Sequence, residues 1–257
     1  MSHKHESLLR TIFHDRVGKW LTEQGVELHL ATPVRQIEGD AGRARALVLA
    51  DGTRRDFDFV IVAAPWRHVR SLLAEDLLAA MPAVANVEQI EPAAITAVHL
   101  WFDRPITLLR HAILVGRLSQ WVFAHTKPRP AVADRGASDD RGSKSPVYYC
   151  QVVISASHRL PARRHDDLLA EVRRELEAVW PDARGACLLR ARVVTEPAAV
   201  FSVQPGVDRF RPPQQTPIEN LALAGDWTAT GWPATMEGAV CSGYRALRAL
   251  GNRGDGR

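Results

Sequence analysis

The sequence predicts a mixed α/β fold, and three stretches carry this prediction. The run Phe59–Ala64 is apolar without alternation, which is typical of a strand buried on both faces. The stretch 221–250 joins a short apolar strand, a Gly-Asp turn and a helix. Between these two stretches, several segments alternate apolar and polar residues, which indicates an antiparallel sheet.

The first 65 residues combine a helix with short strands. Apolar residues recur at helical spacing from Leu8 to Leu21, and Gly25 is a plausible end for that helix. The pair Asp51-Gly52 is a strong hairpin-turn signal. The extended segments expected around it are Val26–Leu30, Val34–Ile37, Ala44–Leu49 and Thr53–Phe57, followed by the apolar run ending before Pro65.

The middle of the chain combines an antiparallel sheet with helices. Helices are expected over Trp66–Ala80 and over His165–Trp180, where Pro181 ends the second. The polar stretch Lys127–Ser145 is rich in Pro, Gly and Asp, and we interpret it as a disordered surface insertion. The strands expected here are Ile95–Phe102, Ala112–Val115, Gln120–Phe123, Val147–Ile154 and Leu188–Val194.

Composition excludes several classes of protein. With 46% hydrophobic and 24% charged residues, the 257-residue chain can bury a real core and is not disordered as a whole. The net charge of +4 and pI of about 9.2 come from scattered Arg, which favours a solvated basic surface over a nucleic-acid partner. Attraction to an anionic lipid surface stays open, so peripheral contact with the inner face of a membrane is compatible with the sequence.

The distribution of cysteine and histidine argues against metal and disulfide chemistry. Cys150, Cys187 and Cys241 are far apart and odd in number, which fits a reducing compartment and gives no zinc spacing. The ten histidines form no HxxxH or HExxH pattern, and no GxSxG of a serine hydrolase occurs. No apolar run is long enough for a spanning helix, and the N-terminus lacks the pattern of a secretory signal, so we expect a cytoplasmic protein without a metal.

The segment Leu221–Gly243, LALAGDWTATGWPATMEGAVCSG, is the one most suited to ligand chemistry. A buried strand ends in Gly-Asp, and a helix is expected to begin near Pro233. Small residues near that helix start let a ligand approach the backbone, and the free N–H groups of the helix suit an anion or a polarised carbonyl. From the residues alone, a tightly packed strand–turn–helix with Asp226 as an ordinary turn residue is about equally compatible.

The run AGDWT…GWPATMEGAVCSG resembles the C-terminal flavin-binding motif of the FAD-dependent amine oxidase and phytoene desaturase superfamily. Within it, TGWPATMEGAV most resembles the squalene-associated FAD-dependent desaturases, which are hydroxysqualene dehydroxylases. The pieces GVELHLATPVRQIE, DFDFVIVAAPW, AITAVHLWFDRPI and QWVFAHT also resemble segments of that family. The resemblance implies a Rossmann-like flavoprotein fold, with a discontinuous FAD-binding domain at 1–65 and 197–257 and a substrate domain of antiparallel sheet and helices at 66–196.

The resemblance also implies which residues contact FAD. The backbone of Val34 would touch the adenine, with Ala64 and Pro65 near the adenosine end, although plain strand packing explains these three equally well. Gly225 and Asp226 would hold the ribityl and phosphate region. The amides of the helix start would face the pyrimidine ring of the flavin; these belong to Met236, Glu237, Gly238 and Ala239. For the carboxylate of Glu237 itself, stabilisation of the helix dipole is the favoured role.

No catalytic residue can be named from the sequence. The resemblance implies a long isoprenoid substrate and the reductive dehydroxylation of hydroxysqualene to squalene, the hydride coming from the flavin. Carotenoid-type desaturation and amine oxidation are alternatives within the superfamily. Four tryptophans are candidates for a lipid tunnel, although each is more often simply core: Trp66, Trp101, Trp121 and Trp232.

One departure from the family pattern concerns the pyrophosphate. The chain contains no GxGxxG, the turn that cradles the pyrophosphate of a dinucleotide. Its first residues already match the middle of the family, so about two-fifths of a usual chain is expected to be missing, through a misplaced start codon, a split gene or a deletion. We therefore expect either a complementing N-terminal chain or a non-catalytic fragment that holds FAD weakly.

Overall fold

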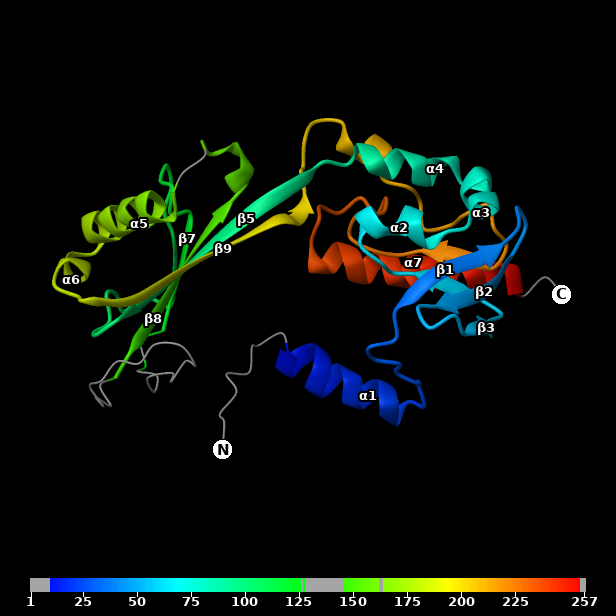
Figure 1. Ribbon diagram of the computed structural model, residues 1–257, viewed down its shortest axis with the longest axis horizontal. Helices are drawn as coiled ribbons and strands as arrows, with labels where there is room; N and C mark the ends of the chain where they lie inside the picture. The colour runs from blue at the N-terminus through cyan, green and yellow to red at the C-terminus, as the bar shows by residue number, and fades with distance from the viewer. Residues whose placement is uncertain (1–9, 126, 128–145, 162–163, 255–257) are drawn as a thin grey trace. The chain divides into compact units, whose positions relative to one another are not determined.

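The computed structural model describes residues 10–125, 127, 146–161 and 164–254, and it divides the chain into two compact units (Figure 1). Unit 1 comprises residues 1–85, 213–228 and 241–257, and unit 2 comprises residues 86–212 and 229–240. Each unit is therefore built from separate stretches of chain, with bounds that differ from the expected division at 1–65, 66–196 and 197–257. The assignment of cofactor binding and substrate binding to the two parts stays a prediction.

Unit 1 begins with a helical segment and an irregular stretch. The π-helical segment η1 (Arg10–Val17) continues into α1 (Gly18–Glu23), and Gly25 follows with φ +78°. The strand predicted over Val26–Leu30 is wrong, because that stretch forms no strand and pairs with no described strand. Its alternating Val, Leu and Leu side chains are exposed, so the alternation here does not mark a buried face.

The predicted hairpin is confirmed and forms a three-stranded antiparallel sheet. Its strands are β1 (Val34–Gly39), β2 (Ala44–Leu49) and β3 (Arg54–Asp56), in the order β1-β2-β3. At the turn, the Asp51 carboxylate accepts a hydrogen bond from the Thr53 N–H at 2.9 Å, and Gly52 adopts φ +87°. Alternation of buried and exposed residues in β2 points Ala44, Ala46 and Val48 into the core.

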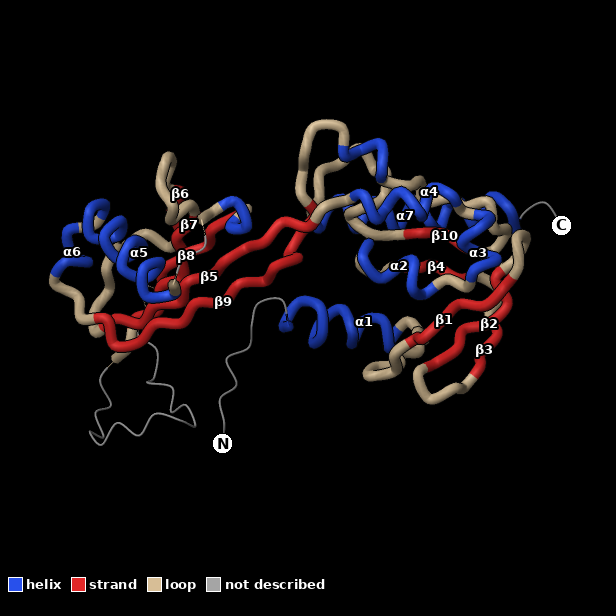
Figure 2. The backbone as a smooth tube through the Cα atoms, turned by 45° about the horizontal axis from the view of Figure 1, so that its top comes forward, coloured by secondary structure: helices blue, strands red, loops and turns tan. Residues whose placement is uncertain are grey.

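A parallel pair of strands forms the second sheet of unit 1. β4 (Val60–Val62) pairs with β10 (Leu221–Leu223), which brings together two segments far apart in the sequence (Figure 2). All three residues of β10 are buried. In β4, however, Ile61 is 42% exposed, so the strand is not covered on both faces as predicted.

The helices of unit 1 differ from the predicted ones at their ends. The helix expected over residues 66–80 is split into α2 (Trp66–Leu72) and α3 (Glu75–Ala80), followed by α4 (Pro82–Ala85). The break arises because the Ala74 N–H donates to the Ile37 carbonyl of β1 at 3.0 Å, which fixes an extended link there. The C-terminal helix α7 (Met236–Gly254) begins three residues after Pro233, the predicted start, because Thr235 caps it. On α7, Ala246 and Leu250 pack against β10 and the residue that follows it.

Unit 2 contains the predicted antiparallel sheet, with strand order β6-β7-β8-β5-β9. The sheet pairs β5 with both β8 and β9, and β9 extends seven residues beyond the predicted end at Val194. The strands are β5 (Pro92–Phe102), β6 (His111–Ile113), β7 (Trp121–Ala124), β8 (Tyr148–Ser155) and β9 (Leu188–Phe201). The predicted insertion at 127–145 lies, except for Lys127, outside the described residues.

One face of this sheet is covered by helix α5. The predicted helix is confirmed as α5 (His165–Val179), and Pro181 begins the short α6 (Pro181–Arg184). Short 3-10 segments complete the unit: η2 (Asn86–Gln89), η3 (Ser157–Arg159) and η4 (Val207–Phe210). The core between sheet and helix contains Val98, Leu100, Phe102, Val122, Val152, Ile154, Leu168, Val172 and Leu176.

Candidate functional site

Gly225, two residues after the end of strand β10, adopts a conformation that requires glycine. Its φ is +143°, and a Cβ added there would lie 2.7 Å from Cδ1 of Trp227. The Gly225 N–H donates to the Ser242 hydroxyl at 2.7 Å, and its carbonyl accepts bonds from the Thr228 N–H and hydroxyl at 3.1 and 2.8 Å. The backbone polar groups of Gly225 are thus satisfied within the protein. What it can offer a ligand is close approach rather than hydrogen bonds.

Trp227 links the segments that follow the parallel strands β4 and β10. Its side chain is 1% exposed, and its indole N–H donates to the Ala64 carbonyl at 3.0 Å. The structure therefore brings Ala64 and Gly225, two predicted cofactor contacts, to the same edge of one sheet. Asp226 stands beside them, half-buried, and Pro65 is exposed just before α2. The fifth predicted residue of unit 1, Val34, is half-buried at the start of β1.

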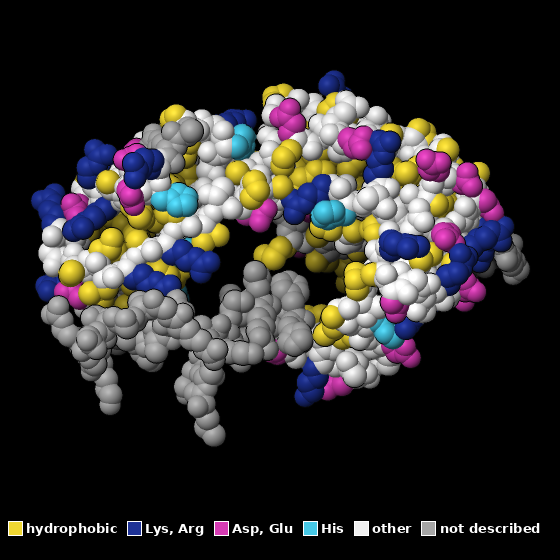
Figure 3. Space-filling view, in the orientation of Figure 1, with side chains coloured by type: hydrophobic (Ala, Val, Ile, Leu, Met, Phe, Trp, Pro, Cys, Tyr) yellow, Lys and Arg dark blue, Asp and Glu magenta, His cyan; other side chains and the backbone are white. Residues whose placement is uncertain are grey.

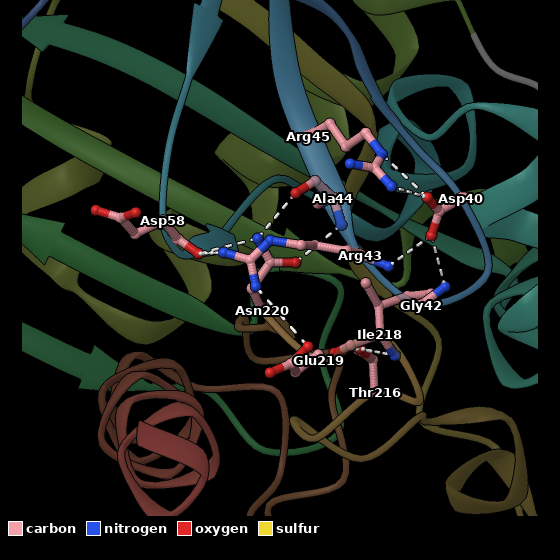
Figure 4. Close-up of polar contacts among 10 residues, drawn as sticks. All are labelled: Asp40, Gly42, Arg43, Ala44, Arg45, Asp58, Thr216, Ile218, Glu219 and Asn220. Atoms are coloured by element: carbon pink, nitrogen blue, oxygen red, sulfur yellow. Dashed lines mark hydrogen bonds and ion pairs between the residues drawn. The ribbon is translucent and has the colours of Figure 1, made fainter. Parts of the chain in front are cut away.

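Asn220, one residue before β10, anchors the strand that positions Gly225 (Figure 4). Its amide side chain is fully buried and donates to the carbonyls of Ala44 and Asp58 at 2.8 and 2.9 Å. Its carbonyl oxygen accepts the Ala44 N–H at 2.8 Å. One side chain thus joins β2, the start of β4 and the start of β10. The predicted sites did not include it, because an Asn before a strand has the composition of an ordinary turn.

The start of α7 belongs to unit 2 and is held from within that unit. The Gly238 N–H donates to the Thr235 hydroxyl at 3.1 Å, and the Ala239 N–H donates to the Thr235 carbonyl at 3.0 Å. A Cβ on Gly238 would lie 2.8 Å from the Pro233 carbonyl, so the backbone passes close there. The amides of Gly238 and Ala239 are thus engaged in the capping turn. Contacts of Met236 and Glu237, which are exposed, with a flavin stay a prediction.

A buried arginine positions the loop before α7. Arg211 donates to the Trp232 carbonyl at 2.9 Å and to the Thr230 hydroxyl at 3.3 Å. It also pairs with Asp208 at 2.8 Å. Arg211 thus fixes the turn that leads into α7, a structural role that sequence reasoning missed. A single Arg in an Arg-rich chain gives no signal for such a role.

The turn at Gly225 and Asp226 in unit 1 fits part of a dinucleotide. A carboxylate directly after a strand, beside a glycine that permits close approach, suits the hydroxyl groups of a ribityl chain. The 19-residue helix α7 supplies an N-terminus of the kind that faces polarised carbonyls. The turn for the pyrophosphate, however, has no counterpart among the described residues. The described residues also include no group of three metal-ligating side chains, and none of their helices is long and apolar enough to cross a membrane.

Among the described residues, the face of the unit 2 sheet opposite α5 is rich in aromatic side chains. His99 and Trp101 of β5 lie on it with Tyr149 of β8, and the Trp101 and Tyr149 ring centroids are 5.3 Å apart. On β7, Trp121 and Phe123 stack at 6.0 Å and are 39% and 40% exposed. Figure 3 shows hydrophobic side chains at the surface of this unit beside Arg and His. Of the four tryptophans considered for a tunnel, Trp101 and Trp121 lie on this face.

One hydrogen-bonded polar pair stands within the aromatic face. The His99 Nδ1 and the Tyr149 hydroxyl are 2.6 Å apart, as diagonal neighbours across β5 and β8. Burial lowers the pKa of His99 below its ordinary value, and the positive charge of Arg192, directly opposite on β9, lowers it further. His99 is therefore neutral near pH 7. Sequence alone could not find this pair, because its members come from strands separated by the 127–145 stretch.

The comparison with protein families decides the relationship. The family described as flavin containing amine oxidoreductase matches residues 9–250. The chain belongs to this family. FAD is the cofactor that this family implies, as the resemblance at the C-terminal motif led us to expect. The finer assignment to hydroxysqualene dehydroxylases is not part of this match.

Curated relatives and solved structures agree with the family. The chain is 26% identical over 236 residues to 15-cis-phytoene desaturase of Solanum lycopersicum, covering 90% of this chain and 39% of the relative. The same enzyme of Synechococcus elongatus is 27% identical, covering 86% and 44%. An oxidoreductase from Methanosarcina mazei has a TM-score of 0.57 at 18% identity, covering 91% of this chain and 52% of the other. The fold is thus that of flavoproteins, and the chain spans about half the length of these proteins or less.

Proposed function

We propose that this protein acts on a long isoprenoid and that its reaction is the reductive dehydroxylation of hydroxysqualene to squalene. The observation that carries the proposal is the aromatic sheet face of unit 2 with its hydrogen-bonded pair His99–Tyr149. A wide aromatic surface suits a flexible hydrocarbon chain, because apolar area buried against it contributes roughly 25 cal/mol per Å². The paired hydroxyl gives that surface one place to recognise an alcohol.

The pair is suited to the loss of a hydroxyl group. Removing an allylic hydroxyl as water requires a proton at its oxygen when the C–O bond breaks. Tyr149 holds such a proton, and neutral His99, in the tautomer with its proton on Nδ1, donates to the phenol oxygen and stabilises the charge that develops there. When bound, the flavin supplies the hydride. The chain itself binds the hydrocarbon, orients the alcohol toward Tyr149 and excludes water.

Desaturation of a carotenoid precursor is the second candidate. The names of the relatives favour it, because two of them are 15-cis-phytoene desaturases. That reaction releases no hydroxyl group, so it assigns the His99–Tyr149 pair no proton to deliver. Both reactions would use the same aromatic face. An isoprenoid substrate from a bilayer would also bring the protein into peripheral contact with a membrane, which we include in the proposal.

Binding to the chain itself separates the two candidates. Quenching of tryptophan fluorescence should show hydroxysqualene binding more tightly than squalene by about two- to tenfold, which corresponds to one hydrogen bond of roughly 0.5–1.5 kcal/mol. Tyr149→Phe should abolish this preference and leave squalene binding unchanged. Tyr244→Phe, at an exposed tyrosine of α7, is the matched control and should keep the preference. Equal binding of the two ligands by the unaltered protein would contradict dehydroxylation and leave phytoene as the ligand to compare.

A second experiment tests the cofactor contacts in the assembled, FAD-loaded protein. Asp226→Ala should speed FAD dissociation, measured by flavin fluorescence, about 10- to 100-fold, because it removes charge-assisted bonds of roughly 1.5–3 kcal/mol. Glu237→Gln should change it less than about fivefold, since its side chain acts through the helix dipole alone. The reverse order would exchange the roles of the two carboxylates. Conversion of hydroxysqualene to squalene by the same preparation, followed by gas chromatography, tests the reaction directly.

A further inference from the structure

The register of the unit 2 sheet arranges the face opposite α5 in rows that cross the strands. The first row is apolar and contains Val194, Ala97, Val153, Trp121 and Ile113. The second row, two residues further along each strand, contains Arg192, His99, Gln151, Phe123 and His111. The third row contains Arg190, Trp101 and Tyr149. The face therefore changes, along the strands, from apolar to cationic and hydrogen-bonding.

The cationic groups at the polar end come from the edge strand β9. Arg190 and Arg192 are exposed and two residues apart, so both side chains lie on the same face, with their Cα atoms about 7 Å apart. The Arg190 guanidinium lies over the Trp101 ring, 4.9 Å from its centroid. Arg192 lies directly opposite His99. Two guanidinium groups thus stand beside the His99–Tyr149 pair.

The positive charge of Arg192 is not neutralised by the described residues. The second and third rows contain no carboxylate among them, and Arg192 forms no ion pair with any described residue. On β9, Glu196 lies four residues from Arg192, a distance of about 13 Å along the strand. Asp103, which follows β5, is engaged with the Cys187 N–H at 2.8 Å and with the arginine next to it. Burial and the charge of Arg192 both lower the pKa of His99, as an unneutralised cation beside it should.

We propose that this face binds an isoprenoid diphosphate, with the phosphate groups at Arg190 and Arg192 and the hydrocarbon over the apolar row. The inference rests on the proposed isoprenoid substrate and adds a second class of ligand for the same face. A guanidinium recognises phosphate through two parallel hydrogen bonds, and a diphosphate has enough oxygen atoms for two guanidinium groups. A neutral alcohol has no charge to offer Arg192. The diphosphate should therefore compete with hydroxysqualene for the face.

Binding of farnesyl diphosphate and farnesol to the full chain tests the proposal, with quenching of tryptophan fluorescence as the readout. The diphosphate should bind about tenfold or more tightly than the alcohol, since the two hydrocarbons are identical. Arg192→Gln and Arg190→Gln should each reduce this preference to about threefold or less. Arg174→Gln, at an exposed arginine of α5, makes the same change in net charge and should keep the preference. Equal binding of the two probes by the unaltered protein, or a preference that either β9 variant retains, would overturn the proposal.

Two further probes distinguish the source of the phosphate. Inorganic diphosphate should bind about tenfold or more weakly than farnesyl diphosphate, because it has no hydrocarbon to cover the apolar row. Vesicles that contain phosphatidic acid present phosphate groups from a bilayer, and their binding should not change in the Arg192→Gln variant. Equal binding of the two diphosphates would assign the arginines to a free anion and refute the role of the apolar row. Vesicle binding that Arg192→Gln abolishes would assign them to a lipid headgroup instead.

The ring of His99 gives a readout that a merely structural role of Arg192 would not produce. In NMR titrations, saturating farnesyl diphosphate should raise the pKa of His99, because a nearby anion favours the protonated ring, and farnesol should not raise it. An unchanged pKa at saturation would contradict the placement of the phosphate. The outcome is separate from that of the proposed reaction, because Tyr149→Phe tests the preference for an alcohol and Arg192→Gln tests the preference for a phosphate ester.

Discussion

Replacing Asn220 with Ala removes the side chain that joins three strands of unit 1. Three hydrogen bonds are lost, each contributing about 1 kcal/mol net, and the buried N–H and carbonyl of Ala44 lose their partner. We therefore expect unit 1 to lose about 3–4 kcal/mol. This should raise the exchange rates of the most protected amides in β2 and β10 by roughly 100- to 1000-fold.

Hydrogen exchange followed by mass spectrometry measures this change in unit 1 alone, which a melting curve of two units would not. Glu219→Gln is the matched control at the adjacent position. The Glu219 side chain is exposed and its ion pair with Arg43 is long, at 3.8 Å, so this substitution should change the stability of unit 1 little. Exchange in β2 and β10 that stays within twofold of the unaltered protein would refute the reasoning for Asn220→Ala.

Asn220→Asp should make the stability of unit 1 depend on pH. The introduced carboxylate would face the carbonyls of Ala44 and Asp58, so its pKa in the folded protein should rise above its ordinary value near 3.9. A group whose pKa is raised by folding stabilises the fold below its unfolded value, and this contribution is lost as the pH rises through the folded value. Protection of β10 in this variant should therefore be greater at pH 3.5 than at pH 7. Protection of β10 that is greater at pH 7 than at pH 3.5, after the same change in the unaltered protein is subtracted, would contradict this prediction.

Three further predictions concern single side chains. Gly225→Ala should destabilise unit 1 by about 1–3 kcal/mol, because alanine is strained at this positive φ and its Cβ would clash with the Trp227 indole. Hydrogen exchange measured over a urea titration checks this. NMR titration should place the pKa of His99 below 6.5, and Arg192→Gln should raise that pKa. In the unaltered protein the unfolded chain binds more protons at this histidine than the folded chain does. The contribution of His99 to stability therefore falls as the pH drops below 6.5. Burial raises the pKa of Cys150 to about 12, so iodoacetamide should label exposed Cys187 first and Cys150 only on unfolding; equal rates would contradict this.

Local patterns predicted most of the strands and helices, and tertiary contacts account for the misses. The hairpin around Asp51-Gly52 and the helix before Pro181 follow from turn chemistry and period, and both were found. The break at Ala74 arises from a bond to β1 that no local pattern encodes. The false strand at Val26–Leu30 has the right alternation but no partner to pair with.

The candidate site was predictable only in part, for a similar reason. The Gly225-Asp226 turn has a recognisable order of residues along the chain, and the structure places Ala64 beside it through Trp227. The His99–Tyr149 pair depends instead on the register between two strands that the chain visits about 50 residues apart. Register is set by the whole sheet, so the pattern of residues along this one chain gives no means of bringing those two side chains together.

The bond from Trp227 to Ala64 spans 163 residues of sequence, and this has a consequence for synthesis. β4 leaves the ribosome long before β10 exists, and at about 5–20 residues per second the delay is roughly 8–30 seconds. During that interval β4 lacks its pairing partner β10, while the strands of the unit 2 sheet, which lie between them in the sequence, can pair with one another. The β4–β10 pair thus forms only after the strands of unit 2 have emerged, and its folding rate is governed by how quickly two distant strand ends meet. A chaperone that holds nascent strands has its longest period of access at β4.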